Sequence, residues 1–294
     1  MKLDRLSKKQ SGLVILIIYL FTLTVGIVTY VIGKSLSLSS IAAMFVADVL
    51  MTLIIYLLGN LLNNASLYDP YWSVLPPFII LLWGIDTASI GLFHVILLLF
   101  VLIVWAVRLT YNWWINWQGF QKQDWRYDLL KEKNEKLYPL TNLMGIHMIP
   151  TIVVYFQLVV AYQIMTKASI NVGYVIGAII ALIAPIIQFV ADKQMYEFRF
   201  DKETKSSVIN TGIWRFSRHP NYFGELLFWV AIYLMYLFGS GKFDLYVIAP
   251  IAMIALFVFI SVPMMEKKLI DRPGYESYKK NVSMLIPFKP KKEE

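Results

Sequence analysis

The sequence has no cysteine, few histidines and little charge, and each shortage excludes a class of chemistry. Without cysteine there is no disulfide framework, thiolate nucleophile, iron–sulfur cluster or cysteine-ligated zinc. Three histidines in 294 residues make a histidine-built metal site unexpected, so we expect no metal. Charged residues make up 16% and apolar residues 58%, whereas soluble domains carry about 25% and roughly 45–50%. This balance indicates a membrane protein.

Long uncharged stretches recur along the chain and predict membrane-crossing helices. A helix needs roughly 20 residues to cross the hydrocarbon core of a bilayer. Five stretches qualify by themselves, namely residues 10–33, 87–107, 137–166, 168–191 and 245–265. A sixth span is expected within residues 35–68, and the shorter runs 70–85 and 226–241 are expected to be the third and seventh spans. The predicted fold class is therefore all-α, a polytopic transmembrane bundle of about eight helices.

The basic residues are distributed unevenly between the loops. With a cytoplasmic N-terminus and eight spans, 24 of the 27 Lys and Arg residues fall on the cytoplasmic side, where the positive-inside rule places them. The net charge of +8 therefore reflects topology, and no nucleic-acid partner is expected. The first apolar run is too long for the core of a cleavable signal and should stay as an anchor. We expect a multi-pass protein of a bacterial plasma membrane with both termini in the cytoplasm.

Polar residues beside the spans are costly in a membrane and usually functional. Asp69 precedes Pro70 at the start of the third span, where it could cap a helix or face a pocket as an acid. Arg108, Tyr111 and Asn112 share one helix face at the end of the fourth span. Arg108 could reach to the membrane interface or form part of a buried anion site.

A third polar group lies on one helical stripe. Gln188, Asp192 and Arg199 are four and seven residues apart, which places them within about 40° of one another on a helix. An amide, an acid and an arginine in a row can hydrogen-bond an amide, a ribose and a phosphate in turn. The alternative is a polar network within the helix itself.

The densest polar group is residues 212–225. Two arginines and a histidine precede a proline that can begin a helix, and such a helix start attracts phosphate. These residues are Arg215, Arg218, His219 and Pro220. Asn221 and Glu225 follow one turn apart and so face the same way. A last acid, Glu266, ends the final span and is followed by a tail that reads as an amphipathic segment on the membrane surface.

Together these motifs resemble the membrane-embedded steroid 5-alpha-reductase family, in particular its bacterial branch, formerly a domain of unknown function. The similarity covers about residues 65–290. The most specific part is the run Ser-Arg-His-Pro-Asn-Tyr-Phe-Gly-Glu at 217–225, supported by Asp-Pro-Tyr-Trp-Ser at 69–73, Asp-Trp-Arg-Tyr at 124–127 and Leu-Ile-Pro-Phe at 285–288. The resemblance implies N-terminal transmembrane helices in residues 1–64 and a catalytic domain in 65–294, with a seven-helix reductase core and one added N-terminal helix.

The resemblance also implies a cofactor, NADPH, bound inside the helical bundle without a Rossmann fold. It implies that Gln188, Asp192 and Arg199 lie along NADPH and that Asn221 and Glu225 lie beside the nicotinamide. The remaining cofactor-binding residues expected are Arg108, Arg215, Arg218, His219, Tyr222 and Glu266. The cytoplasmic arginines are the available partners for the 2′-phosphate that distinguishes NADPH from NADH.

The implied activity is hydride transfer from NADPH to a carbon–carbon double bond conjugated to a carbonyl, in a steroid-like or other lipophilic substrate. Asp69 stands where the eukaryotic reductases have a glutamate that works with a tyrosine on the substrate carbonyl. That tyrosine has no clear match here, and Trp105, Tyr111, Tyr68 and Tyr71 are the residues available. The expected catalytic residues are Asp69, Tyr111 and Glu225, and the expected partners are a lipophilic small molecule and membrane lipids.

Two other classes of function remain open. Isoprenylcysteine and phospholipid methyltransferases, which use S-adenosylmethionine, share the Arg-His-Pro-x-Tyr-x-Gly motif, a nearby C-terminal glutamate and a membrane bundle. The stripe that begins at Gln188 and the groups around Asp69 and Arg108 favour the reductase. A transporter would usually show inverted repeats with broken helices in both halves, and no such repeat is visible in the sequence.

Overall fold

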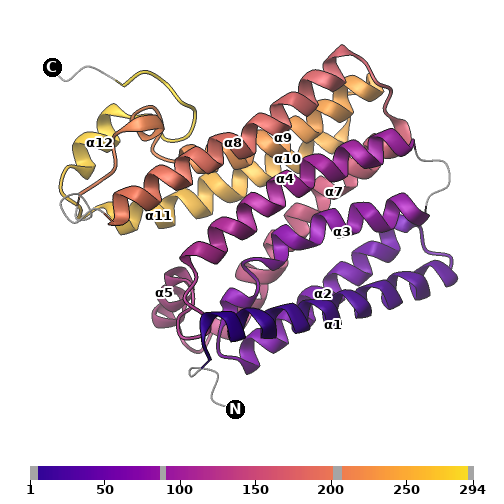
Figure 1. Ribbon diagram of the computed structural model, residues 1–294, viewed down its shortest axis with the longest axis horizontal. Helices are drawn as coiled ribbons and strands as arrows, with labels where there is room; N and C mark the ends of the chain where they lie inside the picture. Colours follow the sequence, from indigo (N-terminus) through magenta and orange to yellow (C-terminus); the bar gives the residue numbers. More distant parts are fainter. Residues whose placement is uncertain (1–5, 87–90, 201–206, 291–294) are drawn as a thin grey trace. The chain divides into compact units, whose positions relative to one another are not determined.

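The computed structural model describes residues 6–86, 91–200 and 207–290. Within these ranges all regular secondary structure is helical, which confirms the all-α fold class. The chain divides into two compact units, Met1–Thr166 and Lys167–Glu294 (Figure 1). Each unit has its own packed helices and is described by itself.

The described part of the first unit contains seven α-helices, one 3₁₀ turn and one π-helix. In chain order they are α1 (Lys8–Ser35), α2 (Ser40–Leu61), the 3₁₀ turn η2 (Ala65–Leu67), α3 (Tyr71–Asp86), α4 (Leu92–Asn116), α5 (Trp125–Lys133), α6 (Tyr138–Thr141), the π-helix η3 (Asn142–Met148) and α7 (Ile149–Lys167). Helix α1 packs against α2, and α3 packs against α4. The short helix α5 begins within the expected Asp-Trp-Arg-Tyr motif and is capped by its aspartate, Asp124.

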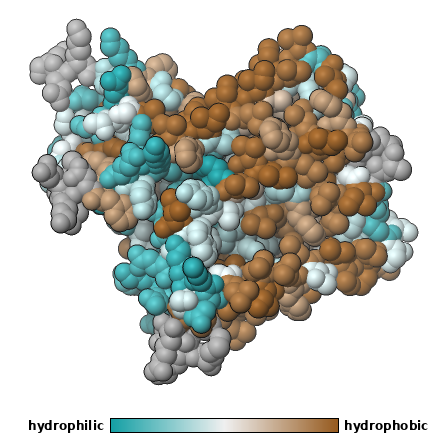
Figure 2. Space-filling model, in the orientation of Figure 1, coloured by the Kyte–Doolittle hydropathy of each residue, from teal (hydrophilic) through white to brown (hydrophobic). Residues whose placement is uncertain are grey.

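Helix α1 shows how the sequence divides a membrane helix into two faces. It begins at a capping box, in which Ser7 and Gln10 each bond the backbone N–H of the other. Its buried residues recur every three or four positions, as a helix with one packed face requires. On the opposite face Leu13, Ile17 and Leu20 are 57–58% exposed. The brown surface of Figure 2 shows that exposed apolar side chains of this kind cover much of the visible face, which suits contact with lipid.

The second unit is centred on two long helices that lie against each other. Its elements are α8 (Val172–Phe200), the 3₁₀ turn η4 (Gly212–Arg215), α9 (Pro220–Ser240), the 3₁₀ turn η5 (Leu245–Val247), α10 (Ile248–Leu256), the π-helix η6 (Phe257–Ser261), α11 (Val262–Leu269) and α12 (Tyr275–Asn281). Helices α8 and α9 pack along their length. Close approach depends on Gly224, where an added Cβ would lie 2.5 Å from the side chain of Gln188 and 3.0 Å from the carbonyl oxygen of Ala184.

Seven helices of the described part are long and apolar enough to cross a membrane, as expected of a multi-pass protein. They are Lys8–Ser35, Ser40–Leu61, Leu92–Asn116, Tyr138–Lys167, Val172–Phe200, Pro220–Ser240 and Leu245–Leu269. The expected seventh span, 226–241, lies in α9. The expected third span, 70–85, forms α3, whose 16 residues extend only about 24 Å, so seven helices rather than eight reach spanning length. Residues 87–90 of the expected fourth span lie outside the described residues.

Candidate functional site

In the second unit, the Ser-Arg-His-Pro motif that starts α9 is bonded to the C-terminal tail. The hydroxyl of Ser217 donates to the carbonyl oxygen of Leu285 at 2.7 Å, and the backbone N–H of Arg218 donates to Ser283 at 2.8 Å. The N–H of Phe288 donates in return to the carbonyl oxygen of Phe216 at 3.0 Å. Two of the sequence motifs that carried the family resemblance, 217–225 and 285–288, therefore form one structural unit. The tail packs on the motif instead of ending as a separate surface segment.

Arg218 is the centre of this assembly. Its Nε and Nη2 atoms contact Glu266 Oε1 at 2.9 and 2.8 Å, and its Nη1 donates to the carbonyl oxygens of Lys279 and Val282 at 2.6 and 3.0 Å. Glu266 also lies 3.1 Å from Lys279 Nζ and 3.5 Å from His219 Nε2. The Arg218 and Glu266 side chains are only 10% and 12% exposed. The structure thus brings together three of the expected cofactor residues, and it uses the guanidinium of Arg218 to hold helix α11 and the tail.

One turn further along α9, Glu225 is buried against α8. Gln188 Nε2 donates to Glu225 Oε2 at 2.6 Å, and Trp229 Nε1 donates to Glu225 Oε1 at 2.9 Å. Gln188 and Glu225 are 1% and 3% exposed. Gln188 Oε1 has no hydrogen-bond partner among the described residues. A ligand group with an N–H, such as a carboxamide, could supply the missing donor there.

The other expected cofactor residues of this unit lie around these two clusters. Tyr222 stacks on the His219 ring with centroids 5.3 Å apart, and the side-chain oxygen of Asn221 accepts from the Tyr222 backbone N–H. Asp192 lies one turn beyond Gln188 on α8 and is partly buried. Arg199, at the end of α8, and Arg215, in η4, are exposed. The Arg215 guanidinium lies 4.4 Å from the centroid of the Phe216 ring.

In the first unit, Asp69 is held by a tyrosine that the sequence analysis did not select. The hydroxyl of Tyr127 in α5 donates a short hydrogen bond to Asp69 Oδ1. No described backbone N–H of α3 donates to the Asp69 carboxylate, so the helix-cap interpretation finds no support. Tyr111, the tyrosine expected to be catalytic, lies on α4 with 54% of its surface exposed. The signal for Tyr127 was its place in the Asp-Trp-Arg-Tyr motif, but the sequence could not show which tyrosine folds onto the acid.

The segment that carries Tyr127 is anchored to the turn that carries Asp69. Asp124 caps α5 by accepting from the Arg126 N–H at 2.9 Å, and it forms an ion pair of 2.7 Å with the Arg126 side chain. The Asp124 N–H donates to the hydroxyl of Ser66 at 2.8 Å. The motifs 69–73 and 124–127 therefore also form one structural unit. Arg108, the expected anion ligand, is partly buried on α4, one turn before Asn112.

The environment of Asp69 changes its acidity. Burial is the main effect, and with the nearby carboxylate of Asp124 it raises the pKa of Asp69 to about 6 from its ordinary value of 3.8. Arg126 and the hydrogen bonds from Tyr127 and Ser66 oppose this rise. Burial also raises the pKa of Tyr127, and Asp69 adds to that effect. Near neutral pH the pair thus combines a carboxyl that can take up a proton with a phenol that keeps its own.

Three of the four assembled motifs fall inside one family match, and the fourth, at 285–288, lies just beyond it. The profile of the family described as "Protein of unknown function (DUF1295)" matches residues 55–282. The chain belongs to the DUF1295 family. It is also similar to the uncharacterized protein C594.04c of Schizosaccharomyces pombe, with 24% identity over 273 residues that cover 80% of this chain and 78% of the relative. No solved structure matches the chain.

The raised pKa of Asp69 predicts a pH dependence of stability. The folded chain holds the Asp69 proton more tightly than the unfolded chain, so the free energy of unfolding should fall as the pH rises from about 4 to about 6 and level off above. Denaturant unfolding in detergent across this range measures the slope. Asp69→Asn should flatten it, whereas Asp128→Asn, at an exposed position of the same helix as Tyr127, should not. An unchanged slope in Asp69→Asn contradicts the prediction.

Proposed function

We propose that this DUF1295 chain is an NADPH-dependent membrane reductase related to the steroid 5-alpha-reductases. The proposed reaction transfers a hydride to a carbon–carbon double bond conjugated to a carbonyl in a lipophilic substrate. The observation that carries the proposal is the buried pair of Gln188 and Glu225, which presents an unpaired amide acceptor close to the start of α9. A carboxylate and an amide acceptor at one place suit the donor-bearing carboxamide of a nicotinamide.

The start of α9 and the residues around it suit the phosphates of the cofactor. A helix N-terminus attracts anions through its free N–H groups and its dipole. The exposed Arg199 and Arg215 lie at the end of α8 and in the turn before α9. Arg218 is committed to Glu266 and two carbonyl groups. In this proposal Arg218 and Glu266 shape the phosphate site, and Arg199 and Arg215 are the arginines available to the 2′-phosphate.

The Asp69–Tyr127 pair is the proposed acid. When bound, NADPH supplies the hydride, while the protein supplies position and electrostatics. Reduction of an enone places charge on its carbonyl oxygen, and a hydroxyl or neutral carboxyl that donates to this oxygen stabilises the transition state. One donor of this kind is typically worth 10²–10³ in rate, or roughly 3–4 kcal/mol. In this role Tyr127 takes the place that the sequence analysis gave to Tyr111.

The chain is further proposed to lie in a bacterial plasma membrane with both termini in the cytoplasm. The support is the distribution of the basic residues. If α3 crosses the membrane together with the seven longer helices, 24 of the 27 Lys and Arg residues fall on the cytoplasmic side. The main alternative function is an S-adenosylmethionine-dependent methyltransferase. It draws on the motif at 218–224 and on Glu266, which the structure places beside Arg218 and His219.

Cofactor binding is tested by thermal unfolding of the purified protein. NADPH at 100 times its dissociation constant should stabilise the folded state by about 2.7 kcal/mol, and S-adenosylmethionine should leave the midpoint unchanged. Arg215→Ala should weaken NADPH more than NADH, because only NADPH carries the 2′-phosphate. Stabilisation by S-adenosylmethionine alone would establish the methyltransferase instead, and stabilisation by neither would remove both enzymes.

The role of Glu225 is tested by exchanging the two buried partners. In Glu225→Gln, the new amide NH2 faces one of the two N–H groups that donate to Glu225, those of Gln188 and Trp229. The variant should therefore be less stable, and its rate of hydride transfer should fall by about tenfold or more. The double variant Glu225→Gln with Gln188→Glu restores complementary hydrogen bonds, since Gln at 225 can accept from Trp229 and donate to Glu at 188. We expect it to recover the melting temperature but not the activity. Recovery of both would show that Glu225 only joins α8 to α9.

The topology is tested directly because the chain has no cysteine of its own. Single cysteines introduced at Lys131 and Lys242, both exposed, serve as reporters. A membrane-impermeant maleimide should label Lys242→Cys in intact bacterial cells and Lys131→Cys only after the membrane is opened. Labelling of Lys131→Cys in intact cells contradicts the proposed orientation.

A further inference from the structure

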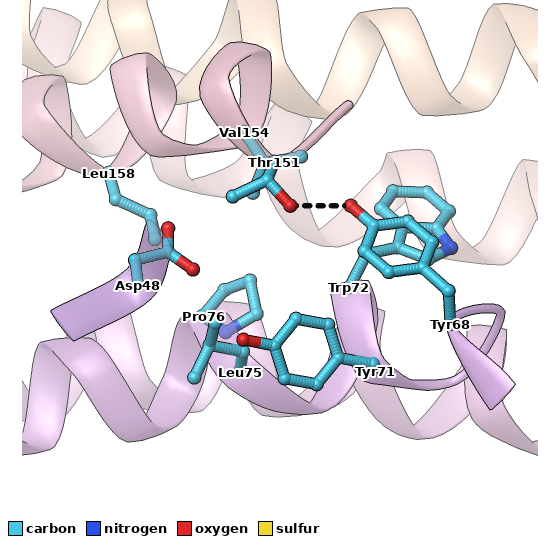
Figure 3. Close-up of a pocket in the computed structure, with 9 residues that line it drawn as sticks. All are labelled: Asp48, Tyr68, Tyr71, Trp72, Leu75, Pro76, Thr151, Val154 and Leu158. Carbon is cyan, nitrogen blue, oxygen red and sulfur yellow. Dashed lines mark hydrogen bonds between the residues drawn. The ribbon is translucent and has the colours of Figure 1, made fainter. Parts of the chain in front are cut away.

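A small cavity lies inside the first unit, beside the turn that carries Asp69. It is lined by side chains of α2, α3 and α7, with Tyr68 from the turn before α3 (Figure 3). Its wall is mostly apolar and includes Trp72, Leu75 and Leu158. The space that the centre of a water molecule can occupy inside it is about 10 Å³. That is room for one small chemical group.

Two polar atoms in this wall have no partner. Asp48 Oδ1 and the hydroxyl of Tyr71 are buried and without a hydrogen bond to any described residue. Both side chains are only 3% exposed, and Figure 3 shows them pointing into the same space from α2 and α3. An unpartnered buried polar group costs about 1–3 kcal/mol. Two such groups facing one cavity indicate that something else satisfies them.

The neighbouring polar groups are already engaged with one another. The hydroxyl of Tyr68 bonds that of Thr151 at 2.8 Å, as the dashed line in Figure 3 marks. Thr151 in turn bonds Thr52 at 3.1 Å, and Thr52 is the hydroxyl that approaches Tyr71 from α2. This chain fixes one side of the cavity. Asp48 and Tyr71 are left as the pair that faces an occupant.

We propose that this cavity binds the hydroxyl group of a lipophilic alcohol. A hydroxyl donates one hydrogen and accepts another, so it can donate to Asp48 Oδ1 and accept from Tyr71 at the same time. An ether or ketone lacks the donor, and an ammonium group lacks the acceptor. Water has the same hydrogen-bonding capacity, but a buried water typically makes about three hydrogen bonds, whereas Asp48 and Tyr71 offer the two that one alcohol hydroxyl needs. The inference concerns the first unit alone and does not require NADPH binding.

The test uses the full-length protein in lipid nanodiscs and a photoactivatable 12-carbon alcohol as the probe. After irradiation, peptide mass spectrometry should locate the label on α2, α3 or α7. Unlabelled 1-dodecanol should compete at least tenfold better than its methyl ether, because one lost hydrogen bond of about 1.4 kcal/mol is a tenfold change in affinity.

Matched variants separate binding from folding. Asp48→Leu and Tyr71→Phe should each reduce site labelling at least tenfold while keeping or raising the melting temperature, since each removes an unpartnered atom. Tyr155→Phe is the control: its hydroxyl bonds Ile41 at 2.5 Å in the same unit but does not line the cavity. That variant should lose stability and retain labelling.

Three results would overturn the proposal. They are equal competition by alcohol and ether, label scattered over the lipid-exposed helices, and labelling that survives Asp48→Leu. The first and third would leave the cavity as a site for structural water only. An NADPH-induced shift in melting temperature, measured on the same nanodiscs, reports the second unit separately. Failure here therefore remains distinguishable from failure of the proposed reductase activity.

Discussion

A polar group inside a bilayer has no water to bond, so it must find its partner within the protein. Much of this chain's polar structure follows from that constraint. Glu225 is buried, and its two oxygens receive N–H donors, one from Gln188 and one from Trp229. The hydroxyl of Tyr19 donates a hydrogen bond to the carbonyl oxygen of Leu67 at 2.7 Å. Such bonds join helices, because in lipid the apolar side chains gain little from meeting each other.

The same constraint changes the meaning of the basic motif before α9. By composition, arginines beside a helix start read as ligands for phosphate. In the structure Arg218 donates its hydrogen bonds to Glu266 and to carbonyl groups of the tail. A nearly buried ion pair adds little net stability, but removing one partner leaves a charge without compensation. The pair therefore fixes where α11 and the tail lie. In the proposed function, anion recognition therefore falls to the exposed Arg199 and Arg215.

The sequence predicted those features of the fold that depend on the local hydropathy of the chain. Hydropathy located the long helices, and 70–85 did form a helix, but its 16 residues fall short of spanning length. The four motifs were found as separate runs, whereas the structure joins 69–73 with 124–127 and 217–225 with 285–288. The pairing of Tyr127 with Asp69 could not be predicted, because side-chain partners far apart in sequence depend on how a loop folds back. The stripe from Gln188 was visible, but not its bond to Glu225.

A buried polar atom without a partner is informative where it faces a cavity or adjoins other polar groups. Gln188 Oε1 lacks a partner, although the neighbouring Glu225 carboxylate accepts two hydrogen bonds. Asp48 and Tyr71 also lack partners, although the nearby hydroxyls of Tyr68 and Thr151 are bonded to each other. Other buried polar atoms without a partner among the described residues, such as Thr22 Oγ1 and Tyr233 Oη, are spread over both units. Asp48 and Tyr71 differ from these because both face one cavity, and Gln188 differs because it adjoins the start of the helix with the densest polar motif. A chain that satisfies Glu225 and Arg218 so fully could replace these three by apolar residues and become more stable. In the two proposals made above, ligands complete them.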